Sequence, residues 1–265
     1  MKKSLTIFFV IFFITCCKID HIQITQKIIE DSKKQNLKAV IYQTNNFKIF
    51  TLQKITDELK PARIYIEGDG MAFLSNNRIS PNPTPRSNFL LKLVAQDQSP
   101  NIVYMARPCQ FIDDKKCEEK YWTNARFSKE IIDSFDEVIK NFSGRKIELI
   151  GYSGGAMVAL FIASKNDNII NLETIAGNLD HEEFTKIHKV LPLDQSLQNK
   201  DLDFVRLSKI PQTHFIGTKD KIIPRAIVDS YLAKLPKQDL VRVIEVQDAT
   251  HSNFNFEKLK DGTRY

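Results

Sequence analysis

The order of hydrophobic and polar positions changes along the chain. Residues 21–35 (HIQITQKIIEDSKKQ) carry apolar side chains at helical spacing, which predicts a short surface helix. Residues 37–55 instead alternate apolar and polar positions on both sides of Asn45 and Asn46. Because this alternation surrounds a pair of turn-forming residues, it predicts a β-hairpin.

From residue 62 onward, short apolar runs alternate with amphipathic segments. This order is typical of a parallel sheet that is covered by helices on both faces. We therefore expect an α/β fold, in which a mostly parallel, doubly wound sheet follows the N-terminal antiparallel hairpin. The predicted strands are residues 62–68, 101–108, 146–152, 172–177, 212–218 and 240–246, and the predicted helices are residues 87–97, 128–142, 154–164, 181–191 and 224–235.

The first residues have the features of an export signal. Lys2 and Lys3 precede an apolar run over residues 5–14, which is too short to span a bilayer but fits the core of a signal peptide. The run ends in FITCC, which resembles the lipobox of bacterial lipoproteins, where a cysteine carries the lipid. Cys16 or Cys17 is the candidate. An ordinary secretory signal followed by two thiols is the alternative.

These features predict three segments and a location. We expect a signal peptide over residues 1–16, a linker with the short helix over residues 17–36, and a single folded domain over residues 37–265. The protein would then be exported, located in the periplasm and held at a membrane by an N-terminal lipid anchor.

Composition and charge narrow the possible partners. Hydrophobic residues make up 42% of the chain, which is ordinary for a globular protein. The formal charge of +6 comes from scattered basic residues, without the arginine stripe and interleaved aromatic residues of a nucleic-acid surface. We therefore expect no nucleic-acid partner.

Two further cysteines, Cys109 and Cys117, lie close together in a polar segment. Export would place them in an oxidising compartment, so we expect them to form a disulfide that closes one loop. Two free thiols are the alternative. A zinc site is disfavoured because no histidine lies nearby at ligand spacing.

Ser153 stands in a local concentration of glycine. The chain contains nine glycines, and Gly151, Gly154 and Gly155 all lie within five residues of the sequence around this serine. A predicted strand, the motif G-x-S-x-G and a predicted helix follow one another, which is the context of a nucleophile elbow. We expect Ser153 to be a nucleophile and the Gly154 N–H to stabilise an oxyanion. A glycine-rich turn that only packs a helix on a strand, or that binds phosphate, is the alternative.

A nucleophilic serine needs a base and an acid that orients the base. His251 lies in the loop after the last predicted strand, and Asp220 directly follows the strand predicted at residues 212–218. The chain order serine, acid, histidine is the one that this type of site uses. Asp180 and Asp248 are rival acids. The remaining histidines of the predicted domain, His181, His188 and His214, fit surface or core positions better than the role of base.

The loop after the first parallel strand is the candidate for a second oxyanion donor. We expect the Asp69 N–H to serve, with Gly70 and Met71 as alternatives. An acidic side chain at short range would oppose a developing anion. The side chains of Glu67 and Asp69 must therefore point away or be hydrogen-bonded.

Several motifs, taken in order, resemble the α/β-hydrolase superfamily, and more narrowly a group of exported bacterial hydrolase-fold proteins. The resemblance covers residues 37–254 and rests on YIEGDGMAF, ARPCQF, YWTNARFS, GYSGGAM, IAGNLDH, GTKDKIIP and ATHSNF. It implies acyl transfer to Ser153 followed by hydrolysis, with no metal or organic cofactor. At Glu67 the chain departs from many relatives, which carry histidine there.

The resemblance leads to a functional expectation and to its rivals. We expect an esterase-like serine hydrolase that acts on a small-molecule or cell-envelope acyl substrate. A peptidase or an acyltransferase would use the same triad. A catalytically silent hydrolase-fold lipoprotein with a binding or envelope role is the alternative outside enzymes.

The sequence also suggests what surrounds the site. Only about 35 residues separate the strands at 172–177 and 212–218, which leaves no room for a large cap domain. We expect a pocket roof from the proline-rich residues 80–87, the disulfide loop with Tyr121 and Trp122, and the NLDHEEF segment; the two aromatic residues could equally be core. Two arginines are candidates to bind a carboxylate or, more ordinarily, to pair with nearby acids: Arg107 and Arg126, with Asp113, Asp114 or Glu118 as partners.

Overall fold

The computed structural model describes residues 22–75, 78–254 and 259. The predicted signal peptide and the candidate lipidation sites Cys16 and Cys17 lie outside these residues. None of the helices within the described part of the chain has the length and apolar character needed to cross a bilayer.

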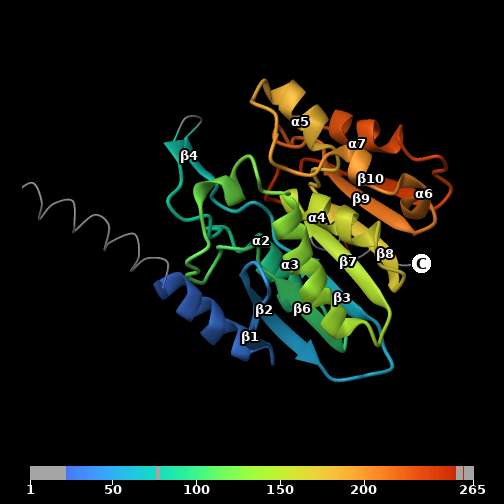
Figure 1. The fold of residues 1–265 in the computed structure, drawn as a ribbon. Coiled ribbons are helices and arrows are strands. Elements are labelled where there is room, and N and C mark those ends of the chain that lie inside the picture. The colour runs from blue at the N-terminus through green and yellow to red at the C-terminus, as the bar shows by residue number, and fades with distance from the viewer. Residues whose placement is uncertain (1–21, 76–77, 255–258, 260–265) are drawn as a thin grey trace, which may run out of the picture.

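One mixed sheet of eight strands forms the centre of the molecule (Figure 1). Its order is β1-β2-β6-β3-β7-β8-β9-β10, and β2 is antiparallel to both of its neighbours, whereas the pairs from β6 to β10 are parallel. The N-terminal hairpin and the mostly parallel sheet are thus confirmed. The strands are β1 (Lys38–Gln43), β2 (Lys48–Ile55), β3 (Ala62–Ile66), β6 (Asn101–Met105), β7 (Ile147–Tyr152), β8 (Ile169–Ile175), β9 (Gln212–Gly217) and β10 (Val241–Val246).

All the helices that the periodicity predicts are present, and a further short helix at Phe204–Leu207 was not predicted. Residues 22–33 form the surface helix. The others are α2 (Phe89–Gln96), α3 (Lys129–Ile139), α4 (Gly154–Ala163), α5 (His181–His188), α6 (Phe204–Leu207) and α7 (Arg225–Leu232), with short 3-10 turns η1 (Glu119–Trp122), η2 (Lys140–Phe142) and η3 (Asn199–Asp201). A small exposed hairpin, β4 (Phe73–Ser75) and β5 (Arg78–Ile79), was not predicted because strands this short leave no periodic signal.

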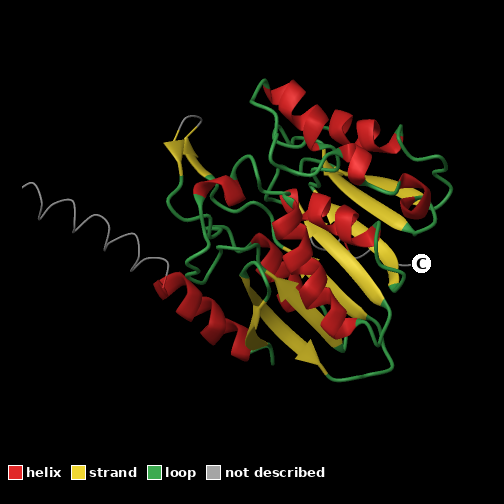
Figure 2. Cartoon of the chain, in the orientation of Figure 1, coloured by secondary structure: helices red, strands yellow, loops and turns green. Residues whose placement is uncertain are grey.

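Period-two alternation along the strands separates two hydrophobic layers. In β3, Ile64 and Ile66 belong to one core cluster, whereas Tyr65 belongs to the other. The first cluster includes side chains of α3, α4 and α7, and Figure 2 shows α3 and α4 in front of the sheet. The second includes side chains of α2, with residues of the 22–33 helix packed against it. The sheet is therefore doubly covered, as its apolar strands predict.

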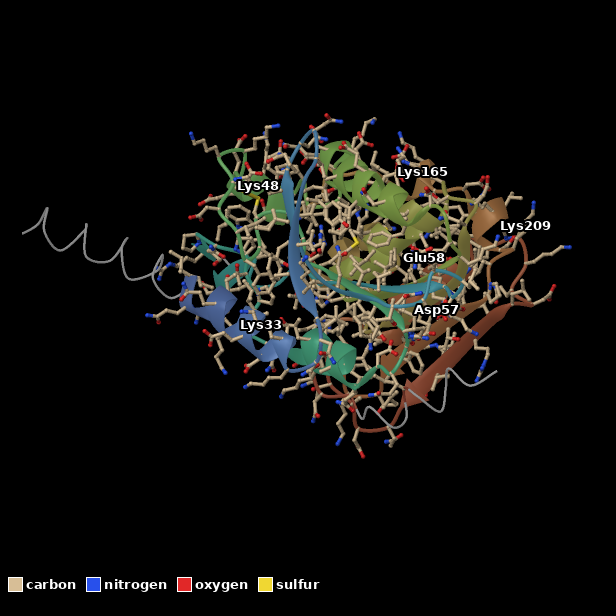
Figure 3. All side chains as sticks on the ribbon, turned by 90° about the horizontal axis from the view of Figure 1, so that it is seen from below. Lys33, Lys48, Asp57, Glu58, Lys165 and Lys209 are labelled. Atoms are coloured by element: carbon tan, nitrogen blue, oxygen red, sulfur yellow. A yellow bond between two sulfur atoms is a disulfide. The ribbon has the colours of Figure 1, made fainter. Side chains whose placement is uncertain are left out.

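The connection between β8 and β9 carries no large cap. Within the described residues 176–211 it contains only α5, η3 and α6, each a short element. In Figure 3 the exposed Lys33 lies on the left of the molecule, well apart from the exposed Lys165 and Lys209 on the right.

Helix α4 packs against β7 and β3 at very short range. All ten of its residues are buried. A Cβ atom added at Gly155 would lie 2.3 Å from the carbonyl oxygen of Ile66, and one added at Gly151 would lie 2.5 Å from the Cα of Ala156. Both positions therefore need glycine so that strand and helix can approach.

This packing predicts that Gly155→Ala destabilises the fold. The new methyl would press on backbone atoms that have no room to move, so the free energy of unfolding should fall by about 1–3 kcal/mol. Gly144→Ala is the matched control, because an added Cβ there meets no atom within 4 Å. Urea unfolding of both variants measures the difference, and equal stability of the two would contradict the packing argument.

Candidate active site

Ser153 stands between β7 and α4 in a strained backbone conformation, with φ 51° and ψ −122°. Non-glycine residues rarely adopt positive φ, and such a residue persists only when its surroundings hold it there. Here the Ser153 N–H donates to the Ile175 carbonyl at 3.1 Å, and the Ser153 carbonyl accepts from Asn178 N–H at 3.0 Å. The turn leaves the serine side chain on the wall of a cavity.

The structure brings Ser153, His251 and Asp220 together into one chain of hydrogen bonds. His251 Nε2 lies 3.0 Å from Ser153 Oγ, and His251 Nδ1 lies 2.9 Å from Asp220 Oδ2. The carboxylate can only accept, so Nδ1 carries the proton and Nε2 is free to accept from the serine hydroxyl. The Asp220 side chain is fully buried and that of His251 is 18% exposed.

Both partners of the serine are fixed by the ends of neighbouring strands. Asp220 follows β9, and its Oδ1 accepts from the backbone N–H groups of Ile222 and Ile223 at 2.8 and 3.0 Å. His251 follows β10, and its carbonyl accepts from the Tyr152 hydroxyl at 3.1 Å. One carboxylate oxygen is thus held by the turn while the other orients the imidazole.

The rival acids are engaged elsewhere. Asp180 caps α5 by accepting from Glu183 N–H at 3.1 Å and also bonds Lys234, Ser230 and Asn199. Burial would raise the pKa of Asp180, but these bonds outweigh it and hold the pKa at about 2. Asp248 forms an exposed ion pair with Lys219 at 2.8 Å.

The other histidines that the structure describes have separate partners as well. His214 is fully buried between Thr174 and Gln212, and burial lowers its pKa to about 3. His181 and His188 bond the carbonyls of Leu197 and Ile222.

The loop after β3 lies directly against the serine turn. A Cβ added at Gly68 would lie 3.1 Å from Ser153 Cβ, and one added at Gly154 would lie 2.1 Å from Asp69 Oδ1. Among the described residues, no acceptor is found for the N–H of Gly154 or of Asp69. For Gly154 this is expected, because the first amides of a helix have no partner within it.

The acidic side chains of this loop, Glu67 and Asp69, are both hydrogen-bonded, as expected from the sequence for side chains close to an oxyanion. Glu67 is 3% exposed and accepts from Gly68 N–H at 2.8 Å and from the Tyr104 hydroxyl at 2.9 Å. Asp69 Oδ1 lies 3.0 Å from Arg107 Nη1, and Asp69 Oδ2 lies 3.6 Å from Arg126 Nε.

The expected partners of the two arginines were therefore wrong. Asp113, Asp114 and Glu118 pair with neither guanidinium; Asp114 instead accepts from the Lys48 N–H at 2.7 Å. These partners were expected because they lie near the two arginines in the sequence. In the folded chain, Arg107 and Arg126 instead contact Asp69 in the loop after β3.

The predicted disulfide joins Cys109 and Cys117, and it is consistent with an exported protein. The loop that it closes supports the loop after β3. Gln110, fully buried, donates to the Gly68 carbonyl at 3.0 Å and accepts from the Arg107 N–H at 3.0 Å. No motif or periodicity marks Gln110 for this role.

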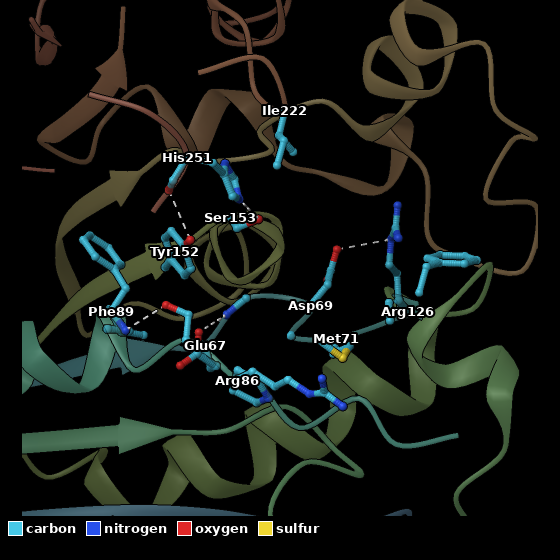
Figure 4. A pocket seen from close by; sticks show the side chains of 17 residues that line it. Glu67, Asp69, Met71, Arg86, Phe89, Arg126, Tyr152, Ser153, Ile222 and His251 are labelled. Atoms are coloured by element: carbon cyan, nitrogen blue, oxygen red, sulfur yellow. Dashed lines mark hydrogen bonds and ion pairs between the residues drawn. The ribbon is translucent and has the colours of Figure 1, made fainter. Parts of the chain in front are cut away.

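A cavity of about 410 Å³ opens beside Ser153 (Figure 4). The proline-rich loop contributes to it, as predicted, through Pro85, Arg86 and Ser87. Of the two alternatives for the aromatic residues, the core position is the one found: Tyr121 packs edge-on against Phe47, and Trp122 donates to the Ser80 carbonyl within the core. The disulfide loop and the NLDHEEF segment were expected in the roof, but they do not line this cavity. The apolar lining comes instead from Met71, Ala72, Phe73, Phe89, Leu90, Tyr152 and Ile222.

Within the described residues, no group of three histidine, cysteine, aspartate or glutamate side chains could hold a metal ion.

Comparison with known proteins identifies the fold of the chain. No protein-family model matches the sequence, and no curated protein matches it. Solved structures do match in shape. Est1E from Butyrivibrio proteoclasticus with bound ferulic acid has a TM-score of 0.62 at 11% identity, over 84% of this chain and 95% of that one.

Two further solved structures have a similar fold. An esterase domain from a Rhodothermus marinus protein gives a TM-score of 0.55 at 10% identity, with coverage of 84% and 92%. XC6422 from Xanthomonas campestris, described as an α/β serine hydrolase without lid, gives 0.51 at 14% identity, with coverage of 85% and 90%. The chain therefore has the α/β-hydrolase fold.

Burial makes Glu67 a source of pH-dependent stability. It raises the pKa of Glu67 from 4.5 to about 7, although Gly68, Tyr104 and Arg107 act in the opposite direction. Between these values the folded state binds more protons than the unfolded state, so this carboxyl lowers stability as the pH rises.

Glu67→Gln should remove that dependence. Relative to the parent, the variant should gain on the order of 3 kcal/mol between about pH 4 and about pH 8. Urea unfolding at both pH values measures the gain, and Glu58→Gln, at an exposed position, controls for the loss of one carboxylate. A parent-to-variant difference that is the same at both pH values would contradict the prediction.

Proposed function

We propose that this protein is a serine hydrolase that cleaves carboxylic esters through an acyl-enzyme. The single observation that carries the proposal is the continuous hydrogen-bonded chain from Ser153 through His251 to Asp220, at 3.0 and 2.9 Å, beside an accessible cavity. The hydroxyl can act as nucleophile, the imidazole as general base and acid, and the carboxylate can orient the imidazole.

In this proposal His251 Nε2 takes the hydroxyl proton as Ser153 Oγ attacks the ester carbonyl. The carbonyl oxygen becomes an oxyanion, which the N–H groups of Gly154 and Asp69 and the positive end of α4 stabilise. His251 then gives the proton to the leaving alcohol. Water attacks the acyl-enzyme with His251 as base, and Asp220 stabilises the imidazolium at both stages.

The lining of the cavity favours an ester with an apolar portion. Met71, Phe73, Phe89, Leu90 and Tyr152 offer aliphatic and aromatic surface next to the nucleophile. Such surface binds hydrocarbon without requiring specific hydrogen bonds. A peptidase or an acyltransferase would use the same triad and stays the nearest alternative among enzymes.

A catalytically silent hydrolase-fold lipoprotein is the second candidate. Its specific support is the Asp69 carboxylate, which lies against Gly154 where an oxyanion would form. A full negative charge there would oppose the reaction, and only the arginine pairing reduces it. A direct test of the nucleophile separates the two candidates.

We also propose that the protein is exported, located in the periplasm and anchored by lipid at Cys16 or Cys17. The signal-like residues 1–16 and the Cys109–Cys117 disulfide support this location. The acyl substrate would then be a small molecule or a component of the cell envelope.

The proposal predicts that a fluorophosphonate probe labels the parent chain and not Ser153→Ala. The oxygen of an activated serine attacks the phosphorus of the probe and displaces fluoride, which leaves a phosphonate ester on the serine. Removal of Oγ removes the attacking atom. Ester turnover should fall on the order of 10⁶-fold, because the triad acts as a unit. Intact mass and gel fluorescence measure the labelling.

Ser143→Ala is the matched control, since this exposed serine lies outside the site. It should label like the parent. Equal labelling of all three folded proteins, or none of the parent, would overturn the hydrolase proposal in favour of the silent one.

The loop geometry predicts that Gln110→Ala weakens catalysis without removing the nucleophile. Loss of the amide frees the Gly68 carbonyl, so the Asp69 N–H next to it loses its fixed position. The value of kcat/KM should fall by about 10- to 100-fold, the penalty expected for misplaced groups.

Steady-state ester hydrolysis measures this effect, with Gln98→Ala, at an exposed position, as control. An unchanged kcat/KM for a folded Gln110→Ala would show that the disulfide loop does not hold the oxyanion donors.

A further inference from the structure

Arg126 lies on the wall of the proposed active-site cavity with its hydrogen-bonding capacity unused. Its side chain is only 9% exposed, and its sole ion pair among the described residues is with Asp69 Oδ2, at 3.6 Å from Nε. Nε is buried and makes no hydrogen bond. The two terminal nitrogens are not among the buried unpaired atoms of the described residues, and the side chain lines the cavity, so their N–H groups are accessible to a ligand there. A buried N–H without an acceptor is costly, and a bound anion would supply acceptors to this guanidinium.

The local charge is not balanced by protein groups. Arg107 shares the same carboxylate at the shorter distance of 3.0 Å, so two guanidinium groups face one aspartate. Arg86, which is exposed, adds a further positive charge to the cavity wall. The other acidic residue there, Glu67, is buried and has a pKa of about 7, so at neutral pH it carries only part of a negative charge, which acts on Arg107. An excess of positive charge therefore faces the cavity.

Aromatic rings hold the Arg126 guanidinium in place. Its central carbon lies 5.7 Å from the Phe127 ring centroid and 5.8 Å from that of Phe184. These contacts stabilise a cation without using its N–H groups. Figure 4 shows Arg126 beside Asp69, with Asp69 between it and Ser153 in this view. A planar fork of donors, on the wall of the same cavity as Ser153, has the shape that recognises carboxylate or phosphate.

We propose that the ester substrate carries an anionic group, a carboxylate or a phosphate, which binds Arg126 in the cavity beside Ser153. This inference rests on the proposed hydrolase activity and assigns Arg126 as the residue that determines substrate charge. The anion supplies the acceptors that the protein does not, and the apolar lining receives the hydrocarbon part of the same molecule.

The first experiment uses the full-length chain in mild detergent and matched pairs of esters. Mono-para-nitrophenyl glutarate is compared with para-nitrophenyl valerate, which places the anion on the acyl side. Para-acetoxybenzoate is compared with its methyl ester, which places it on the alcohol side. In at least one pair we expect kcat/KM to be about tenfold or more higher for the anionic ester. A preference for the neutral ester in both pairs would overturn the inference, and this result needs no variant.

The second experiment assigns the preference to a residue. Arg126→Met should lower the ratio of kcat/KM for the preferred anionic ester to kcat/KM for its neutral partner by about 10- to 100-fold. Loss of the pairing with Asp69 affects both esters alike, so this ratio isolates the contact with the anion. Arg126→Lys should keep part of the preference, because it retains the charge but not the fork. Arg242→Met, at an exposed position on β10, is the control.

Each outcome has a distinct meaning. Equal losses on both esters would mean that Arg126 only supports the fold around Asp69, and this would overturn its assignment. A preference that persists in Arg126→Met would do the same. Failure of the hydrolase proposal looks different, because neither ester would then be cleaved and the fluorophosphonate would not label Ser153.

Discussion

The close approach of α4 to β3 and β7 is the constraint on which the rest of the site depends. Ser153 occupies a backbone conformation whose strain is of order 1–3 kcal/mol, and it stays there because the helix that follows is completely buried. Gly151 and Gly155 permit that burial by removing the atoms that would separate strand from helix. Packing of the hydrophobic core thus fixes the direction of one hydroxyl group.

The parallel arrangement of the sheet then determines what this hydroxyl meets. The carboxyl ends of β3, β7, β9 and β10 lie at one edge, since these strands run in the same direction. Each contributes the residues that follow it: the Gly68–Asp69 loop, Ser153, Asp220 and His251. Segments that are about 180 residues apart in the sequence therefore converge without a dedicated cap.

Much of this could be predicted from the sequence, because the signals are local. A strand, G-x-S-x-G and an apolar helix occur within one short segment, and Asp220 and His251 each directly follow a strand with a clear apolar run. The pairing of Arg107 and Arg126 with Asp69 had no such signal. It joins loops far apart in the chain, and pattern and periodicity describe only neighbours along the sequence.

The aromatic residues show the same limit. Trp122 and Tyr121 follow the disulfide loop and were candidates for the pocket, but whether an aromatic ring faces a cavity or the core depends on the packing of other elements. Phe73 and Tyr152, which do line the cavity, carry no feature that marks them in the sequence. The exposed β4 strand that carries Phe73 is also too short to be recognised.

Asp69 combines two opposed effects at one position. In the proposed mechanism its backbone N–H stabilises an anion, whereas its carboxylate lies so close to Gly154 that a Cβ added there would be 2.1 Å from Asp69 Oδ1. The two arginines resolve the conflict, because their charges outnumber the single carboxylate and draw it into an ion-paired network. Removal of the carboxylate alone would leave Arg126 without its ion-pair partner and Arg107 with only the partly charged Glu67 nearby, which is more costly than removal of the whole network. If Ser153 is the nucleophile, as proposed, the acidic side chain of Asp69 beside it is therefore tolerable only together with Arg107 and Arg126, and the three residues form a single electrostatic unit.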